Sequence, residues 1–243
     1  MVFENILDAI GGTPIVKLQR MPEADSAEIL VKVEALNVGG SIKTRTAYNM
    51  LREAAAQGIL TKDSIICEPT SGNQGIGIAL VGAVCGYRVE IVMPDSVSEE
   101  RRKLIAQYGA KVILVHDDGD IGKCIAQCLE VAQRRAAEDP NVYIPQQFVN
   151  PHNPKAHRDG TGREILEQVG APIHGFCSGI GTGGTIASEM TPEGLTPELN
   201  SKQLLSFVPK IGEMCHVDCI QVYSLDSTNL EPRHWLGVAN AIR

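Results

Sequence analysis

The sequence predicts an α/β protein of two domains, built from open and mostly parallel sheets flanked by helices. Short apolar runs alternate with helical patterns from about Ile6 to Ile186. Strand, helix and strand in this order favour right-handed crossovers and parallel strands. Three loops that lead into helices are rich in Gly, Ser and Thr, and ligands of such sheets bind at the carboxyl ends of the strands.

Six short runs are expected to form buried strands, and four longer segments between them are expected to form helices. The first helix lies within 41–58, where Ala47, Met50, Leu51 and Ala54 share one face and Gly58 provides a stop signal. The other helices are expected within 72–86, 98–110 and 121–137. The strands are expected at 28–34, 64–68, 88–94, 111–115, 141–144 and 174–180.

The composition is that of an ordinary soluble globular protein, with 43% hydrophobic and 21% charged residues. A net charge of -7 argues against nucleic acid as the main partner, and no apolar run has the length of a membrane span. The N-terminus carries acids where a signal peptide needs a basic region, so we expect a cytoplasmic protein.

The seven cysteines are scattered and predict neither disulfides nor a metal site. Disulfide frameworks belong to short secreted chains with dense, paired cysteines. Cys215, His216 and Cys219 have the spacing of half a zinc site, but no second pair with suitable spacing follows them. We therefore expect no metal.

The loop GIGTGGTI, at 179–186, has the composition of a phosphate-binding loop. Its glycines let the backbone approach an anion closely, while hydroxyls and the N–H groups of a helix start can donate hydrogen bonds. A tight turn that binds nothing is the alternative. No Lys-Ser/Thr follows as in a P-loop, and no acid follows at dinucleotide spacing. The candidate phosphate ligands are Gly181, Thr182, Gly183, Gly184 and Thr185.

The loop PTSGNQG, at 69–75, is a second candidate anion site. Backbone amides from Ser71 to Gln74, together with the hydroxyls of Thr70 and Ser71, could hold a carboxylate. The alternative is an ordinary helix start that Ser71 or Asn73 caps. This loop alone therefore does not decide between the two.

Lys43, in NVGGSIKTRTA, stands at the start of a predicted helix, where the partial positive charge of the helix disfavours a cation. Burial and the helix N-terminus both favour the uncharged amine, which forms a Schiff base with an aldehyde. The alternative is a lysine that extends its ammonium group to solvent. An activated lysine together with a phosphate loop indicates pyridoxal 5′-phosphate, whose aldehyde and phosphate need these two elements.

Five motifs resemble, in the same order, the cysteine synthase and cystathionine β-synthase family of fold-type II pyridoxal-phosphate enzymes. The five motifs are the three loops described above together with IGGTPIVKL at 10–18 and QQFVNPHNPKAH at 146–157. The resemblance implies that Lys43 forms the Schiff base and removes the substrate α-proton, that Asn73 bonds the 3′-oxygen of the cofactor, and that 181–185 holds its phosphate. It also implies a substrate-carboxylate site formed by Thr70, Ser71, Gly72, Gln74 and Gln147.

The activity that the resemblance implies is β-replacement on an activated serine, most closely the synthesis of L-cysteine from O-acetyl-L-serine and sulfide. Related reactions stay open: cysteine desulfhydration, diaminopropionate formation and cystathionine synthesis. A catalytically impaired relative could instead bind a partner's C-terminal peptide, as the family binds that of serine acetyltransferase. The family also implies a homodimer.

The sequence departs from the family pattern at several places. Thr44 stands where the family has an acid, Val38 stands where proline is usual, and Gly160–Arg163 replaces Thr-Thr-Gly-Pro, so the leaving group and the nucleophile stay open. The residues after Ile186 do not follow the family, and its late serine or threonine contact to the pyridine nitrogen is missing. We expect an N-terminal domain, 1–149, with Lys43 and the carboxylate loop, and a shortened C-terminal domain, 150–243, with the phosphate loop.

Overall fold

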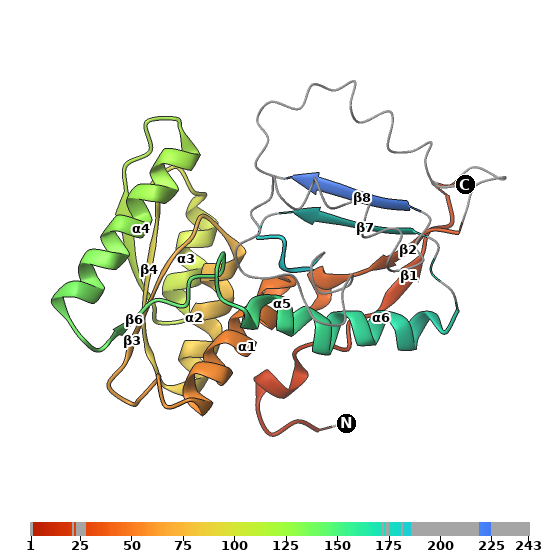
Figure 1. The fold of residues 1–243 in the computed structure, drawn as a ribbon, viewed down its shortest axis with the longest axis horizontal. Coiled ribbons are helices and arrows are strands. Elements are labelled where there is room, and N and C mark those ends of the chain that lie inside the picture. Colours follow the sequence, from red (N-terminus) through yellow and green to blue (C-terminus); the bar gives the residue numbers. More distant parts are fainter. Residues whose placement is uncertain are drawn as a thin grey trace. The chain divides into compact units, whose positions relative to one another are not determined.

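The computed structural model describes residues 2–20, 22, 28–171, 173, 175–180, 182–185 and 219–224. The chain forms two compact units. Unit 1 comprises 1–12 and 34–153, and unit 2 comprises 13–33 and 154–243 (Figure 1).

Unit 1 is built on a four-stranded sheet in the order β5-β4-β3-β6, and each neighbouring pair is parallel. The strands are β3 (Ile65–Pro69), β4 (Arg88–Pro94), β5 (Lys111–Val115) and β6 (Val142–Tyr143). The prediction of four strands in these places, and of a parallel sheet, is confirmed.

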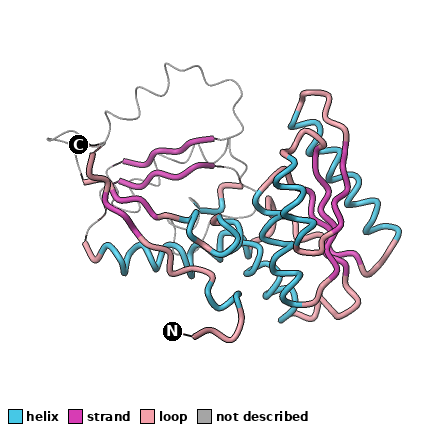
Figure 2. The backbone as a smooth tube through the Cα atoms, turned by 180° about the vertical axis from the view of Figure 1, so that it is seen from behind, coloured by secondary structure: helices cyan, strands magenta, loops and turns pink. Residues whose placement is uncertain are grey.

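Helices cover both faces of this sheet (Figures 1 and 2). They are α1 (Lys43–Ala56), α2 (Asn73–Cys85), α3 (Glu99–Gln107) and α4 (Ile121–Glu138), in the places that the sequence predicts. The 3-10 turns η1 (Ile6–Ala9), η2 (Glu34–Leu36) and η3 (Val38–Gly40) also belong to unit 1, and the short helix α5 (His152–Ala156) contains the end of unit 1 and the residues at which unit 2 resumes.

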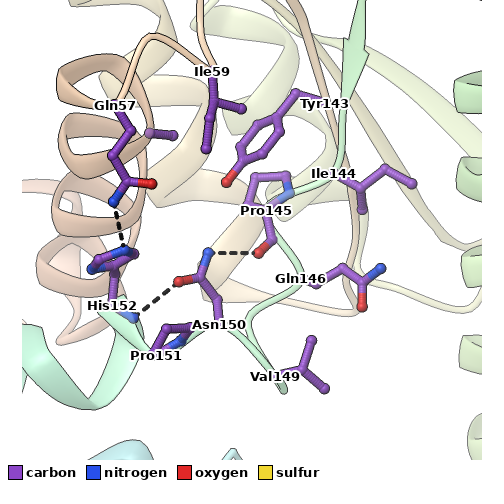
Figure 3. Close-up of a pocket in the computed structure, with 11 residues that line it drawn as sticks. Gln57, Ile59, Tyr143, Ile144, Pro145, Gln146, Val149, Asn150, Pro151 and His152 are labelled. Carbon is purple, nitrogen blue, oxygen red and sulfur yellow. Dashed lines mark hydrogen bonds between the residues drawn. The ribbon is translucent and has the colours of Figure 1, made fainter. Parts of the chain in front are cut away.

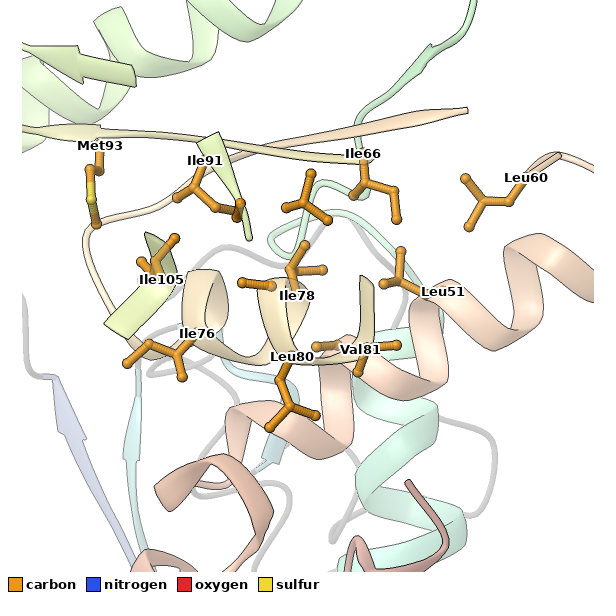
Figure 4. Close-up of a cluster of buried hydrophobic side chains, with 14 of the residues drawn as sticks. Leu51, Leu60, Ile66, Ile76, Ile78, Leu80, Val81, Ile91, Met93 and Ile105 are labelled. Atoms are coloured by element: carbon orange, nitrogen blue, oxygen red, sulfur yellow. The ribbon is translucent and has the colours of Figure 1, made fainter. Parts of the chain in front are cut away.

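The main core of unit 1 lies between the sheet and the helices α1, α2 and α3 (Figure 4). Ile66 and Ile91 of the sheet pack there with Leu51, Ile78 and Ile105 of the helices. A second cluster on the opposite face joins the sheet to α4 and contains Ile65, Cys67, Val92, Cys124 and Cys128. Because helices cover both faces, the strands read as continuous apolar runs.

The strand order places a topological switch point between β3 and β6. The chain passes from β3 to β4 and β5 in one direction and then returns to the other side of β3 as β6. In sheets of this kind the ligand crevice lies outside the carboxyl ends of the strands at that point. The loops that follow β3 and β6 therefore form the expected ligand region of unit 1.

In the described part of unit 2, two short strand pairs accompany the helix α6 (Gly162–Val169). The strands β1 (Ile15–Lys17) and β2 (Leu30–Lys32) are antiparallel, whereas β7 (Gly175–Ile180) and β8 (Cys219–Ser224) are parallel. A π-helical turn, η4 (His157–Thr161), runs into α6. Neither α6 nor β8 was predicted from the sequence.

The prediction of a buried strand at 28–34 is wrong in its burial. The strand is shorter, and Leu30 and Val31 are 39% and 38% exposed. The reason is that β2 belongs to a two-stranded antiparallel ribbon and not to a sheet with helices on both faces. Among the described residues, no helix is long and apolar enough to span a membrane.

Candidate active site

Lys43 is the first residue of α1 and follows a glycine turn. Gly39 and Gly40 have φ values of 78° and 76°, in the left-handed region that favours glycine. A Cβ atom on Gly39 would also lie 2.5 Å from Thr44 Oγ1, so space as well as conformation requires glycine there. The Lys43 N–H donates to Ser41 Oγ at 3.3 Å.

The environment of the Lys43 side chain favours its uncharged form. Burial lowers the pKa of the Lys43 amine, as the sequence analysis predicts. Its Nζ atom forms no hydrogen bond or ion pair with the described residues. The N-cap residue of α1 is Ile42, and no side chain caps the helix. A buried amine without an anionic partner loses its proton more readily than an exposed one.

Helices α1 and α2 pack closely at Gly77. A Cβ atom at that position would lie 3.0 Å from both Ala47 Cβ and Lys43 O. Thr46 Oγ1 lies 2.9 Å from Lys43 O and 2.7 Å from Gln74 Oε1, and thereby joins the first turns of the two helices. The Nε2 atom of Gln74 is buried and has no partner in the described protein. The start of α1 and the start of α2 therefore lie together.

The loop that joins β3 to α2 leaves the helix start uncapped. Gly72 is the N-cap residue, and no side chain caps α2, so the expectation that Ser71 or Asn73 caps it is wrong. Thr70 is buried, and its Oγ1 accepts from the Gly72 N–H at 3.2 Å. Ser71 is half-buried and Asn73 is exposed. Uncapped N–H groups at a helix start attract anions.

Gln147 lies after β6, on the other side of the switch point. It is buried, its N–H donates to Glu68 Oε1 at 3.2 Å, and its carbonyl accepts from Asn153 Nδ2 at 2.7 Å. Its side-chain amide forms no hydrogen bond with the described residues. Unit 1 therefore brings Lys43, the loop 70–74 and Gln147 to the same end of the sheet.

Glu68, which was not predicted from the sequence, is the best-buried acid of this region. Its side chain is 0% exposed, and it accepts hydrogen bonds from the N–H groups of Gln146 at 2.9 Å and Gln147 at 3.2 Å. Burial raises the pKa of Glu68 to about 7, and the two hydrogen bonds oppose that rise. The signal in the sequence was a charged residue at the end of an apolar strand.

The glycine-rich loop lies in unit 2, after β7. Gly183 has a φ of 78°, and both Gly183 and Gly184 are buried. Thr182 Oγ1 accepts from the Gly184 N–H at 3.3 Å, and Thr185 Oγ1 lies 3.4 Å from His157 Nε2. Gly181 lies outside the described residues. The predicted need for glycine in this turn is met at Gly183.

A separate cavity of unit 1 contains none of the predicted site residues (Figure 3). It has a volume of about 410 Å³ and lies at the C-terminal end of α1, the end opposite Lys43. Asn150 Nδ2 donates to Pro145 O at 2.8 Å, and the side chains of Gln57 and His152 lie 3.2 Å apart, between Gln57 Nε2 and His152 Nε2. These polar groups of the wall mostly bind one another.

Comparison with known proteins decides the family. The model of the family described as pyridoxal-phosphate dependent enzyme matches residues 6–192. The chain belongs to this family. Its cofactor is pyridoxal phosphate.

The relatives of this family member include cysteine synthases. It is 47% identical to the cysteine synthase of Flavobacterium sp. over 186 residues and 43% identical to a probable cysteine synthase of Bacillus subtilis over 188 residues. Each match covers 76% of the chain and 59% of the relative. The chain therefore spans a little under two thirds of the length of these curated relatives.

Solved structures place this family member among fold-type II enzymes. A hydrogen sulfide-producing enzyme from Fusobacterium nucleatum matches with a TM-score of 0.71 and 38% identity, over 86% of this chain and 63% of that one. A lysine-to-alanine mutant of O-ureido-L-serine synthase, with O-ureido-L-serine bound, matches with a TM-score of 0.75 and 36% identity, over 94% and 64%. The predicted fold class is confirmed.

A second family model matches the last part of the chain. The family described as Asparaginase, N-terminal, matches residues 178–243. The two matches overlap over 178–192, so the glycine-rich loop at 179–186 belongs to both. The residues after Ile186, which depart from the pyridoxal-phosphate pattern, thus resemble another family.

Two residues of this chain, Lys43 and Gly183, have the properties that pyridoxal phosphate requires of its binding site. An aldehyde needs an uncharged amine, and Lys43 is half-buried, has a lowered pKa and has no partner among the described residues. A phosphate needs a turn in which the backbone comes close, and Gly183 provides a left-handed position there. The first requirement is met in unit 1 and the second in unit 2.

Proposed function

We propose that this chain catalyses β-replacement on an activated serine and forms L-cysteine from O-acetyl-L-serine and sulfide. The observation that carries the proposal is the half-buried amine of Lys43, which has no partner among the described residues and whose pKa desolvation lowers, beside the uncapped start of α2. Cysteine synthases among the similar relatives support the choice of substrate.

The cofactor-binding residues follow from this proposal. Lys43 would hold the cofactor covalently through its uncharged amine, and Asn73 would bond its 3′-oxygen. Pyridoxal phosphate, when bound, supplies an electron sink for the charge that develops at the substrate Cα. The phosphate would be held by Gly181, Thr182, Gly183, Gly184 and Thr185.

The substrate would be held by its carboxylate between the two sides of the switch point. The N–H groups at the start of α2 and the amides of Gln74 and Gln147 are donors of the kind that a carboxylate needs. Thr70, Ser71 and Gly72 would complete this site. Lys43 would remove the proton at Cα, a step that needs an uncharged base near neutral pH. Acetate would then leave Cβ, the sulfur of sulfide would bond there, and the proton held by Lys43 would return to Cα.

A second candidate function rests on the C-terminal match to another family from residue 178. A chain whose second unit departs from the family could bind the C-terminal peptide of a partner such as serine acetyltransferase at the loop 70–74. Cysteine desulfhydration, diaminopropionate formation and cystathionine synthesis are the alternatives within the enzyme class. For the first proposal, the synthesis of L-cysteine, we also propose that the protein is a cytoplasmic homodimer.

Absorbance spectroscopy of the purified chain with pyridoxal phosphate tests the proposal. The bound cofactor should give a visible band that Lys43→Ala abolishes and that the exposed control Lys123→Ala retains. Borohydride reduction followed by peptide mapping should label Lys43. An unlabelled Lys43, or an unchanged band in Lys43→Ala, would contradict the enzymatic role.

Addition of substrates separates the candidate functions. O-acetyl-L-serine should change the visible band, and sulfide should then yield cysteine. A band that does not respond to O-acetyl-L-serine would point to another amino acid. A colourless protein that binds the acetyltransferase peptide would favour the second candidate.

A further inference from the structure

Glu68 occupies a position where a carboxylate is energetically costly. Its side chain is 0% exposed, and the partners that the structure gives it are two backbone N–H groups, without a cation. Transfer of an ionised carboxyl group from water to such a site is unfavourable unless it gains strong hydrogen bonds. The two N–H groups therefore have to be held in place for the ionised form to be stable.

The turn that donates these hydrogen bonds is itself unusual. Gln146 has a φ of 54°, a left-handed conformation that is disfavoured for residues other than glycine. Its carbonyl accepts from the N–H groups of Val149 and Asn150, and the Asn150 side chain closes the turn onto Pro145 (Figure 3). The hydrogen bond from Gln146 N–H to Glu68 ties this strained turn to β3.

Glu68 also connects the two halves of the proposed carboxylate site. One half begins at Thr70, two residues after Glu68 along the chain. The other half is Gln147, whose N–H donates to Glu68 Oε1. The two segments are 79 residues apart in the sequence, and this side chain joins them directly.

We propose that Glu68 is a positioning residue that fixes Gln147 relative to the loop 70–74 and thereby sets the affinity for the amino-acid carboxylate. The inference rests on the proposed function and names a residue that acts through Gln147, without touching the substrate.

The action of Glu68 should depend on pH because its own carboxyl group changes charge near neutral pH. The titratable groups that sense its charge are Cys67 on β3 and Tyr143 on β6, and the pKa of each is raised, so both are uncharged near neutral pH. Burial raises the pKa of Glu68 itself to about 7. The ionised form accepts charge-assisted hydrogen bonds from both N–H groups, whereas a protonated carboxyl keeps one carbonyl acceptor and a hydroxyl oxygen that accepts more weakly. Substrate binding should therefore weaken below pH 7.

The test is Glu68→Gln, which keeps the shape of the side chain but turns an NH₂ group toward one of the two N–H groups. The KM for O-acetyl-L-serine should rise about tenfold, because a charge-assisted hydrogen bond is lost. The KM for sulfide and the cofactor band should stay unchanged. The wild-type KM should rise below pH 7, and that of the variant should not. Glu90→Gln, which removes another buried carboxylate of the same sheet, is the matched control and should leave the KM for O-acetyl-L-serine unchanged.

A second readout does not depend on activity. The amide NMR signals of Gln146 and Gln147 should titrate with a midpoint near pH 7 in the wild type and should lose that titration in Glu68→Gln. Thermal melting of the variant controls for folding. An unchanged KM for O-acetyl-L-serine in a folded variant would overturn the positioning role. If the wild type forms no cysteine, the proposed function fails, and amides that do not titrate would still overturn the role of Glu68.

Discussion

Two buried carboxylates on adjacent strands of the same sheet have opposite electrostatic properties. Glu68 of β3 accepts from two backbone N–H groups, and burial raises its pKa to about 7. Glu90 of β4 stands opposite Cys67 in the register. Burial raises the pKa of Glu90 as well, but the hydrogen bonds and charges of Arg135 and Lys111 outweigh burial and hold that pKa below its ordinary value.

The difference shows that the hydrogen-bond partners of a buried carboxylate determine its pKa and which segments of the chain it connects. The Glu90 carboxylate binds Arg135 of α4 with two hydrogen bonds, from Nε at 3.0 Å and Nη2 at 3.2 Å, and so fastens that helix to the sheet. The Glu68 carboxylate faces the loop after β6, at the switch point where ligands bind. One acid holds two layers together, and the other holds a proposed binding loop.

The largest effect that separates the two acids is the pH dependence of stability through Glu68. Its folded-state pKa of about 7 lies above its ordinary 4.5, so its contribution to stability is fully present below pH 4.5 and is lost as the pH rises through 7. Relative to Glu68→Gln, the wild type should lose about 3 kcal/mol of unfolding free energy between pH 4.5 and pH 8. Urea denaturation of both proteins across this range measures the difference. If the difference in unfolding free energy between the two proteins does not vary with pH, the raised pKa of Glu68 is contradicted, and with it the contrast to Glu90.

A smaller effect of opposite sign is expected at Glu90. Its pKa is lowered, so its contribution is present above pH 4.5 and is lost as the pH falls through the folded-state value. At pH 7, Arg135→Met should lower the free energy of unfolding by less than the change expected for Glu68, because Arg135 is partly exposed. This loss of stability should become smaller in acid, where Glu90 is protonated. In the background of Glu90→Gln the same substitution should cost less. Equal losses in both backgrounds would contradict the pairing.

The smallest effect is expected at an ion pair outside the sheet. Lys103 and Glu99 pair across one turn of α3 at 2.9 Å, but their side chains are 73% and 67% exposed. Lys103→Gln should therefore change the free energy of unfolding by about 0.5 kcal/mol at most. A loss as large as that from Arg135→Met would mean that burial does not explain the difference among these charges.

Much of unit 1 could be predicted because its signals are local. The apolar faces of α1 and the strands follow from periodicity, and Gly58 and Gly86 end their helices with φ values of 72° and 78°. The lowered pKa of Lys43 agrees with the prediction, and its cause is desolvation. The burial of 28–34 could not be predicted, because it depends on whether a sheet covered by helices or a two-stranded ribbon forms there.

The sequence by itself determined the order of the strands β3 to β6 and the helices α1 to α4, the positions of the glycine-dependent turns, the family and its cofactor. The tertiary structure alone decided that β6 returns beside β3, that Glu68 meets Gln146 and Gln147, and that no side chain caps α2. The physical reason is range. Apolar periodicity and glycine conformations act between near neighbours in the chain, whereas the burial and the partners of one carboxylate depend on a segment 79 residues away.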